Sequence, residues 1–238
     1  MKEKEQLLLA QVLDLFADEF AEKAILRGGM VLKVLGSARY TNDLDYLFVP
    51  YKSKKDILPK ILSCLKQIKL SSVTYSLNSQ CLRILLSVEK VSIQIEIKVA
   101  QAVKSSVIST RLYSPQFELP KRLIHIVDHR VSLANKLAAW NERRLIRDLY
   151  DIWFFLQMNI APDLETLVPR LKKPIYSKQI KKRDYFNGKT AEDFYDFFRD
   201  KVAELSDREI ESQLLNYLVK DEVAGLVPLI RSSLVKLR

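Results

Sequence analysis

A glycine pair followed by a short alternating segment constrains this fold more than any other feature of the chain. Residues 26–49 read LRGGMVLKVLGSARYTNDLDYLFV and hold three of the five glycines among 238 residues. Residues 43–49 alternate polar and apolar side chains and stop at Pro50, which predicts a β-strand. Residues 30–35 predict a short helix that Gly36 ends. The stretch therefore predicts a turn, a short helix and a strand in close succession.

Two aspartates occupy the start of this strand. Asp43 and Asp45 are two residues apart, so their side chains point to the same face. Two carboxylates side by side repel each other unless a cation lies between them. Magnesium is held by carboxylate oxygens and keeps substrate phosphates as further ligands. The pair predicts a magnesium site; the alternative is two surface charges on an edge strand.

The glycine pair predicts the other half of such a site. Without side chains, Gly28 and Gly29 allow a phosphate to approach the backbone N–H groups at the start of the following helix. Taken alone, the pair also fits a plain turn. The alternative phosphate loop, Gly36-Ser37, is rejected because only five residues separate it from Asp43, too few for the intervening helix.

A third carboxylate lies in the alternating run SIQIEIKVA, residues 92–100. Glu96 stands between Ile95 and Ile97, so it either faces solvent with its polar neighbours or lies beside the aspartates on a neighbouring strand. The second arrangement completes a three-carboxylate site for one or two metal ions. Such a site aligns an attacking hydroxyl and a phosphoryl leaving group.

The rest of the chain divides into two halves. The first half predicts an α+β arrangement with a mostly consecutive sheet and flanking helices, and the second half predicts a helical bundle. The pattern turns helical from about residue 119, so we expect domains at 1–119 and 120–238. Further helices are expected at 5–23, 54–69, 128–158, 163–171, 190–204, 207–220 and 222–236, and further strands at 72–77, 81–88 and 92–100.

A surplus of positive charge favours a polyanionic partner. The chain has 39 Lys and Arg against 29 Asp and Glu, and such a balance is typical of proteins that bind RNA or DNA. The clearest cluster spans residues 171–189, where aromatic residues are interleaved with cations; a solvated charged loop is the alternative. The predicted RNA-binding residues are Lys172, Lys173, Lys181, Lys182 and Arg183.

The expected location follows from what the sequence lacks. No apolar run approaches the length that spans a bilayer. The N-terminal segment reads as an amphipathic helix rather than a signal peptide. Cys64 and Cys81 have no metal or redox spacing. We therefore expect a cytoplasmic protein with reduced cysteines and no membrane association.

Two blocks of the chain resemble a known family. The block at residues 26–48 and a second block, KLAAWNERRLIRDLYDIWFFL at residues 136–156, occur in the order found in the AbiEii/AbiGii toxins, with Glu96 between them. This family has a polymerase-β-like nucleotidyltransferase fold and includes mycobacterial nucleotidyltransferase toxins. The resemblance is specific over roughly residues 25–155.

The resemblance implies a Mg²⁺-dependent (or Mn²⁺-dependent) enzyme that adds nucleotides from an NTP to RNA, such as the tRNA 3′ end, and is countered by a cognate antitoxin. It implies that the helical domain completes the active site. Asp43, Asp45 and Glu96 would hold metal, and Gly28, Gly29, Arg39, Thr41, Lys136 and Asp151 would bind the NTP, with Lys136 and Asp148 also catalytic.

Three features leave alternatives open. Family members often have Ser or Thr where this chain has Met30, so a hydroxyl contact to a phosphate is missing, which bears on NTP affinity and choice. Arg143 and Arg147 could instead form surface ion pairs with Asp148 and Asp151. The protein could also transfer the nucleotide to a protein hydroxyl, or bind RNA or an antitoxin without catalysis.

Overall fold

The structure is a computed structural model that describes residues 2–173, 185, 186, 188 and 190–238. The chain forms two compact units, residues 1–128 and residues 129–238. Each unit has its own core.

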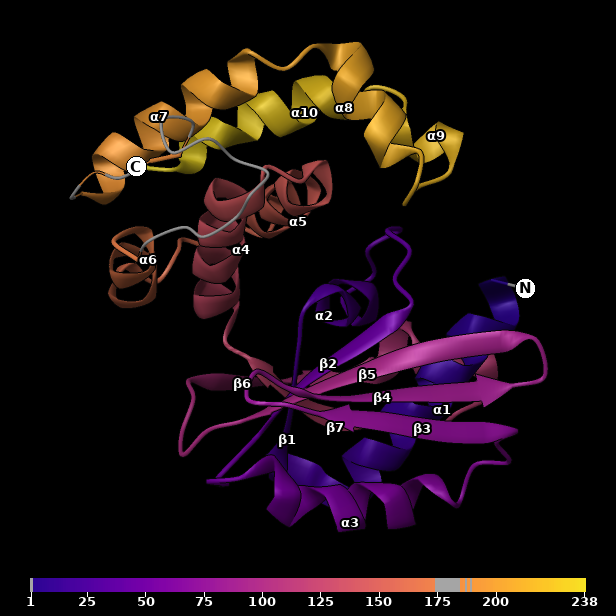
Figure 1. The fold of residues 1–238 in the computed structure, drawn as a ribbon. Coiled ribbons are helices and arrows are strands. Elements are labelled where there is room, and N and C mark those ends of the chain that lie inside the picture. The colour runs from indigo at the N-terminus through magenta and orange to yellow at the C-terminus, as the bar shows by residue number, and fades with distance from the viewer. Residues whose placement is uncertain (1, 174–184, 187, 189) are drawn as a thin grey trace. The chain divides into compact units, whose positions relative to one another are not determined.

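The first unit is built around one seven-stranded mixed sheet (Figure 1). The strand order is β3-β4-β5-β2-β1-β7-β6. β2 runs parallel to β5 and antiparallel to β1, and β1 runs parallel to β7. The strands are β1 (Ala24–Arg27), β2 (Asp43–Phe48), β3 (Ser72–Leu77), β4 (Leu82–Val88), β5 (Val91–Val99), β6 (Ser105–Ser109) and β7 (Leu123–Val127). The helices are α1 (Lys2–Phe20), η1 (Ala21–Lys23), α2 (Gly29–Val34), α3 (Lys54–Leu65), η2 (Thr110–Leu112) and η3 (Ser114–Phe117).

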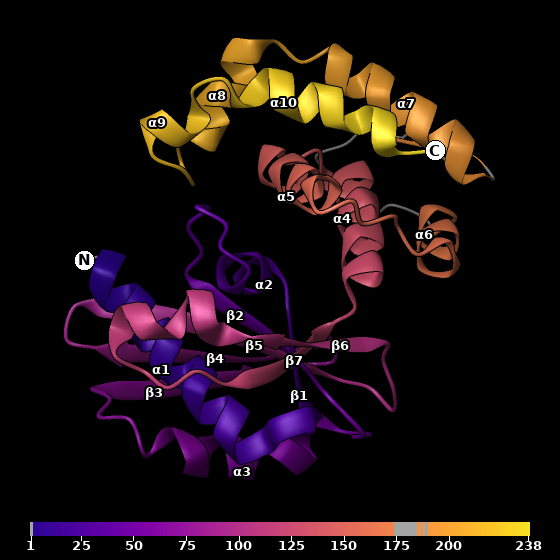
Figure 2. The ribbon, with the colours of Figure 1, turned by 180° about the vertical axis from the view of Figure 1, so that it is seen from behind.

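Helix α1 covers one face of this sheet. Figure 1 shows α1 behind the strands, and Figure 2 shows it in front of them from the opposite side. Its apolar face is buried, and the Phe16 ring lies 5.1 Å from Tyr46 and 6.1 Å from Phe48, between ring centroids. Both partners belong to the buried half of β2, whose residues alternate between buried and half-buried. The side chains between them, including Asp43 and Asp45, therefore lie on the other face, here called the open face of the sheet.

Three strands of the sheet were not predicted from the sequence. β1, β6 and β7 have only four or five residues each, too short for alternation to stand out. β7 contradicts the expectation of helix from about residue 119, because residues 123–127 pair with β1 and β6 in the sheet. The sheet therefore continues beyond the predicted domain boundary at 119–120.

The second unit is helical. Its elements are α4 (His129–Arg143), α5 (Ile146–Gln157), α6 (Leu164–Leu171), α7 (Ala191–Ala203), α8 (Asp207–Leu214), α9 (Lys220–Val223), α10 (Leu226–Ser233) and η5 (Leu234–Lys236). The expected single helix at 128–158 is wrong, because Arg144 has a positive φ of 53° that ends α4 before α5 begins. Aromatic rings fill the core, with Trp140 4.5 Å from Phe198, centroid to centroid, in an edge-to-face arrangement.

Candidate active site

The glycine pair connects β1 to α2 in a conformation that other residues avoid. Gly28 has φ 75° and ψ −154°, a region that is essentially restricted to glycine. A Cβ atom on Gly28 would overlap the Asp45 carboxylate, and one on Gly29 would overlap a guanidinium nitrogen of Arg39. Because the two glycines lack side chains, Asp45 and Arg39 can pack directly against the backbone of the turn. The sequence did not reveal this role of the glycines.

The aspartates of β2 lie beside this turn. Asp43 and Asp45 are half-buried on the open face of the sheet, as the period of two predicts. The Thr41 hydroxyl donates a hydrogen bond to Asp43 Oδ1 over 2.6 Å, which orients that carboxylate. Arg27 on β1 is the register partner of Asp45. The predicted metal-binding residues Asp43 and Asp45 and the predicted NTP-binding residue Thr41 therefore lie beside the Gly28-Gly29 turn.

The segment between α2 and β2 is held by its own polar contacts. Arg39 and Thr41 are both buried. Arg39 Nη1 donates to the Tyr40 carbonyl over 3.2 Å, and the Gln6 side-chain amide of α1 donates to the Thr41 carbonyl over 2.8 Å. Burying a guanidinium is costly unless its donors are satisfied. The Arg39 side chain is buried against Gly29, in the segment that leads into β2.

Glu96 lies on the same open face as the aspartates. β5 runs parallel to β2, and Glu96 is the register partner of Asp45. The sequence left open whether Glu96 faces solvent with its polar neighbours or lies beside the aspartates. Both hold at once, because Glu96 shares its face with Lys98 and with both aspartates. Its carboxylate lies 3.4 Å from Arg83 Nη2 and 3.8 Å from Lys98 Nζ. The sequence pattern placed Lys98 only as a solvent-facing neighbour of Glu96 and did not single out Arg83, which the register of a β4–β5 hairpin could have revealed.

The donor set suits a hard cation. Across the residues that the structure describes, no three His, Cys, Asp or Glu side chains converge to hold a metal ion. Magnesium is commonly bound by only one or two protein carboxylates together with substrate phosphates. Asp43 and Asp45 provide two such carboxylates on adjacent same-face positions, so the residues fit a metal that also contacts a triphosphate.

Four charged side chains form a second cluster, within the helical unit. Lys136 Nζ of α4 lies 2.6 Å from Asp151 Oδ2 and 3.6 Å from Asp148 Oδ1 of α5. Arg143 binds Asp148 with two parallel hydrogen bonds of 2.6 and 2.7 Å. Both aspartates have side chains that are 0% exposed, so these are not the surface ion pairs that the sequence offered as an alternative. The cluster joins α4 to α5.

The charge of Asp148 is stabilised by its partners. Burial alone would raise the pKa of Asp148, but the hydrogen bonds from Arg143 and the positive charges of Lys136, Arg143 and Arg147 lower it below its ordinary value. Asp148 is therefore an anion when folded at neutral pH. Its carboxylate holds the cationic side chains of Arg143 and Lys136.

The predicted RNA-binding residues are only partly described. Lys172 and Lys173 follow α6 and are exposed. Lys181, Lys182 and Arg183 lie outside the described residues.

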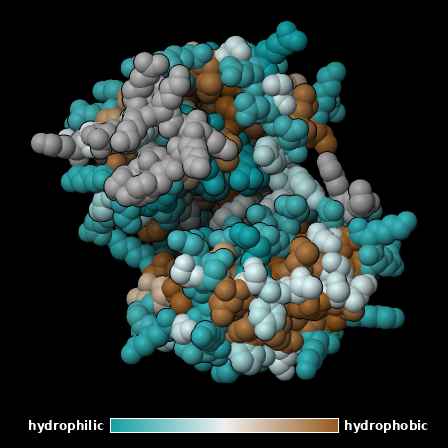
Figure 3. All heavy atoms as spheres, viewed as in Figure 1, coloured by the Kyte–Doolittle hydropathy of each residue, from teal (hydrophilic) through white to brown (hydrophobic). Residues whose placement is uncertain are grey.

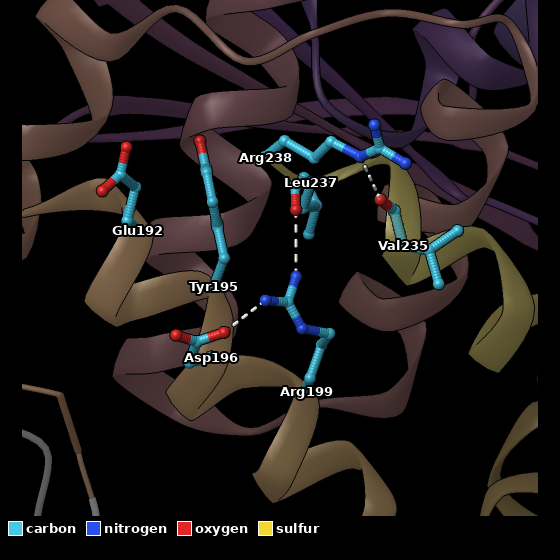
Figure 4. Close-up of a pocket in the computed structure, with 7 residues that line it drawn as sticks. All are labelled: Glu192, Tyr195, Asp196, Arg199, Val235, Leu237 and Arg238. Carbon is cyan, nitrogen blue, oxygen red and sulfur yellow. Dashed lines mark hydrogen bonds and ion pairs between the residues drawn. The ribbon is translucent and has the colours of Figure 1, made fainter.

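Two of the larger cavities among the described residues lie apart from the predicted site residues. One, of about 350 Å³, is in the helical unit (Figure 4). It is lined by Glu192, Tyr195, Asp196, Arg199, Val235, Leu237 and Arg238. Burial raises the pKa of Tyr195 to about 12, and Arg199 Nη1 donates to the Leu237 carbonyl over 2.9 Å. The other, of about 620 Å³, runs beside α1 in the first unit.

The family match of this chain identifies it as a nucleotidyltransferase. The chain belongs to the family of AbiEii nucleotidyltransferase toxins of type IV toxin–antitoxin systems, whose sequence profile matches residues 11–222. A comparison with curated protein sequences gave no match. Across the described residues, no helix is long and apolar enough to cross a membrane.

Solved structures show the same fold. JHP933 from Helicobacter pylori is similar with a TM-score of 0.52 and 16% identity, over 98% of this chain and 92% of that one. MenT4, a nucleotidyltransferase toxin from Mycobacterium tuberculosis H37Rv, is similar with a TM-score of 0.52 and 12% identity, over 97% and 93%. Enzymes of this kind use NTP substrates and a divalent metal.

Proposed function

We propose that this enzyme transfers a nucleotidyl group from an NTP to the 3′ end of an RNA, with tRNA as the acceptor class, in a Mg²⁺-dependent reaction in the cytoplasm. A cognate antitoxin would counter it. The observation that carries the proposal is the placement of Asp43 and Asp45 on one face of β2, directly beside the Gly28-Gly29 turn and Arg39. Carboxylates for a metal and groups for a phosphate thus occur together.

In the proposed reaction, an RNA hydroxyl oxygen forms a bond to the α-phosphorus of the NTP. The bond from that phosphorus to the oxygen bridging to the β-phosphate breaks, pyrophosphate leaves, and the hydroxyl proton passes to solvent water. Asp43, Asp45 and Glu96 would hold the divalent metal, which supplies charge neutralisation at the reacting phosphate. The backbone of Gly28 and Gly29 and the side chains of Arg39 and Thr41 would position the triphosphate.

The proposal also includes Lys136, Asp148 and Asp151 in NTP binding and catalysis, because the family resemblance assigns them to the active site. Lys136 already forms an ion pair of 2.6 Å with Asp151. A triphosphate contact by Lys136 would compete with that ion pair.

The choice of RNA rests on charge. The net charge of +10 and the exposed Lys172 and Lys173 favour a polyanionic acceptor. We include Lys181, Lys182 and Arg183 in the proposed RNA-binding residues because they continue the same basic run in the sequence.

The test is to incubate the pure protein with total RNA and each α-labelled NTP, with Mg²⁺, with Mn²⁺ or with EDTA. We expect metal-dependent label in RNA, concentrated in the tRNA fraction. Label in protein alone would replace RNA with a protein hydroxyl as acceptor. RNA binding with no label in either fraction would overturn the catalytic proposal in favour of a silent binding module.

A further inference from the structure

A row of charged side chains crosses the open face of the sheet. The strand registers place Arg83, Glu96, Asp45 and Arg27 opposite one another on β4, β5, β2 and β1 in turn. Adjacent strands are about 4.8 Å apart, so Arg83 stands roughly 10 Å from Asp45 at the backbone. The row therefore continues outward from the proposed metal-binding aspartate toward the edge of the sheet.

Two cations in this region share one carboxylate. Arg83 and Lys98 both contact Glu96, and their side chains are 48% and 39% exposed, whereas that of Glu96 is 21% exposed. Ion pairs at such exposure are weak because water and salt compete for both partners. A guanidinium donates more strongly to a phosphate through a bidentate pair. A phosphate reaching this face can therefore take these cations from Glu96.

The strand beside Arg83 carries hydroxyl groups on the face of the row. Ser76 of β3 is the register partner of Arg83, and Thr74 and Ser72 follow on the same face of that strand. Figure 3, viewed as in Figure 1, shows teal and white residues next to brown hydrophobic ones over the first unit. Serine and threonine hydroxyls, with Arg and Lys, are the groups that commonly contact phosphates and sugars.

We propose that Arg83 and Lys98 bind the phosphodiester backbone of the acceptor strand next to its reacting end, and that this binding releases Glu96 from its ion pairs. Glu96 then faces the metal with Asp45, its register partner. This inference rests on the proposed function and adds to it the place of the acceptor, which would lie over strands β4 and β5 on the same face of the sheet. Glu96 pairs with Arg83 and Lys98, and no three such carboxylates converge among the described residues, so Glu96 must leave these cations to join Asp45 at a metal.

The test compares binding and turnover in variants of the whole protein. The double variant Arg83→Gln plus Lys98→Gln removes two charges from the row. Its matched control is Lys4→Gln plus Lys90→Gln, which removes two exposed charges elsewhere on the same unit. The probe is a fluorescent single-stranded RNA of twelve nucleotides, titrated at several salt concentrations without NTP and without metal.

We expect the double variant to bind this RNA at least tenfold more weakly than the control. The salt slope should fall by about 1.4, because each lost phosphate contact in a single strand removes about 0.7 from it. KM for RNA should rise while KM for NTP stays the same. Arg83→Lys should restore part of the affinity, since the charge remains and only the planar fork is lost.

Glu96→Gln provides an independent check. It removes the carboxylate that competes for both cations, so RNA should bind more tightly while nucleotide transfer falls. Equal RNA affinity and salt slope in the double variant and its control would overturn the inference, even if the wild type labels RNA. Weaker RNA binding by the double variant in a protein that labels no RNA would retain the phosphate site and overturn the proposed function alone.

Discussion

The two units use carboxylates in opposite ways. In the sheet, Asp43 and Asp45 stand side by side and half-buried on an open face. In the helical unit, Asp148 and Asp151 are fully buried and contact Lys136 and Arg143 at ion-pair distance. Like charges kept together cost stability, whereas buried opposite charges compensate one another.

The difference suggests that the carboxylates of the sheet serve the reaction and that those of the helical unit stabilise the fold. A protein retains neighbouring carboxylates where a cation is to bind, and perturbed or crowded acids cluster at functional sites. A compensated buried cluster instead joins two helices. The family resemblance assigns residues from both groups to the active site, so experiments that separate catalysis from stability sharpen the comparison.

The largest expected effect is on transfer by Asp45→Asn. Losing a metal ligand should remove several kcal/mol of transition-state stabilisation, which is on the order of a thousandfold in rate. The thermal midpoint should not fall, because the substitution relieves repulsion from Asp43. Steady-state labelling of RNA and a thermal melt measure the two quantities. Asp56→Asn on α3, an exposed aspartate, is the control; retained transfer by folded Asp45→Asn would refute metal binding through this pair.

The second effect is on stability, by Asp148→Asn. Removing one side of a buried ion pair leaves Arg143 without its carboxylate partner and Lys136 with Asp151 alone. The substitution should lower the free energy of unfolding by about 3 kcal/mol. Urea unfolding measures it. Asp196→Asn breaks an exposed pair with Arg199 and should cost less than about 1 kcal/mol. If Asp148→Asn unfolds like the wild type but loses transfer, the contrast between the units fails and Asp148 belongs to the chemistry.

A third prediction concerns the glycine turn. Gly28→Ala places a Cβ against the Asp45 carboxylate at positive φ, so it should cost about 2 kcal/mol and displace Asp45 from its position. Gly225→Ala has a similar φ of 73° but meets no atom within 4 Å, so it should cost about 1 kcal/mol. Urea unfolding and the labelling assay should show transfer lost only in Gly28→Ala. Equal behaviour of the two variants would mean that Asp45 does not depend on the turn.

The smallest effect is on the free energy of unfolding at acidic pH. The pKa of Asp148 is lowered in the folded state, so its contribution to stability is present above about pH 4, the pKa of an unfolded aspartate, and is lost as pH falls through the folded value. The difference in unfolding free energy between wild type and Asp148→Asn should therefore shrink below about pH 4. A difference that stays constant to the lowest pH at which the protein folds would contradict the lowered pKa.

Local patterns in the sequence predicted the main elements of the candidate site. The alternation of residues 43–49 placed Asp43 and Asp45 on one face, because a strand repeats every two residues whatever surrounds it. The glycine pair and the following apolar residues predicted the turn and α2. The short strands β1 and β7 were missed because four or five residues carry little periodicity and their pairing supplies the missing information.

The sequence by itself determined that this chain carries two same-face aspartates beside a glycine turn, a third strand acid and an excess of positive charge, since these are properties of local spacing and composition. Only the tertiary structure decided that Glu96 is opposite Asp45, because a parallel register between strands some fifty residues apart depends on the whole sheet. It also decided that Glu96 contacts Arg83 and Lys98. The burial of Asp148 and Asp151 was likewise a tertiary outcome, because the partners that compensate a buried charge come from packing α4 against α5.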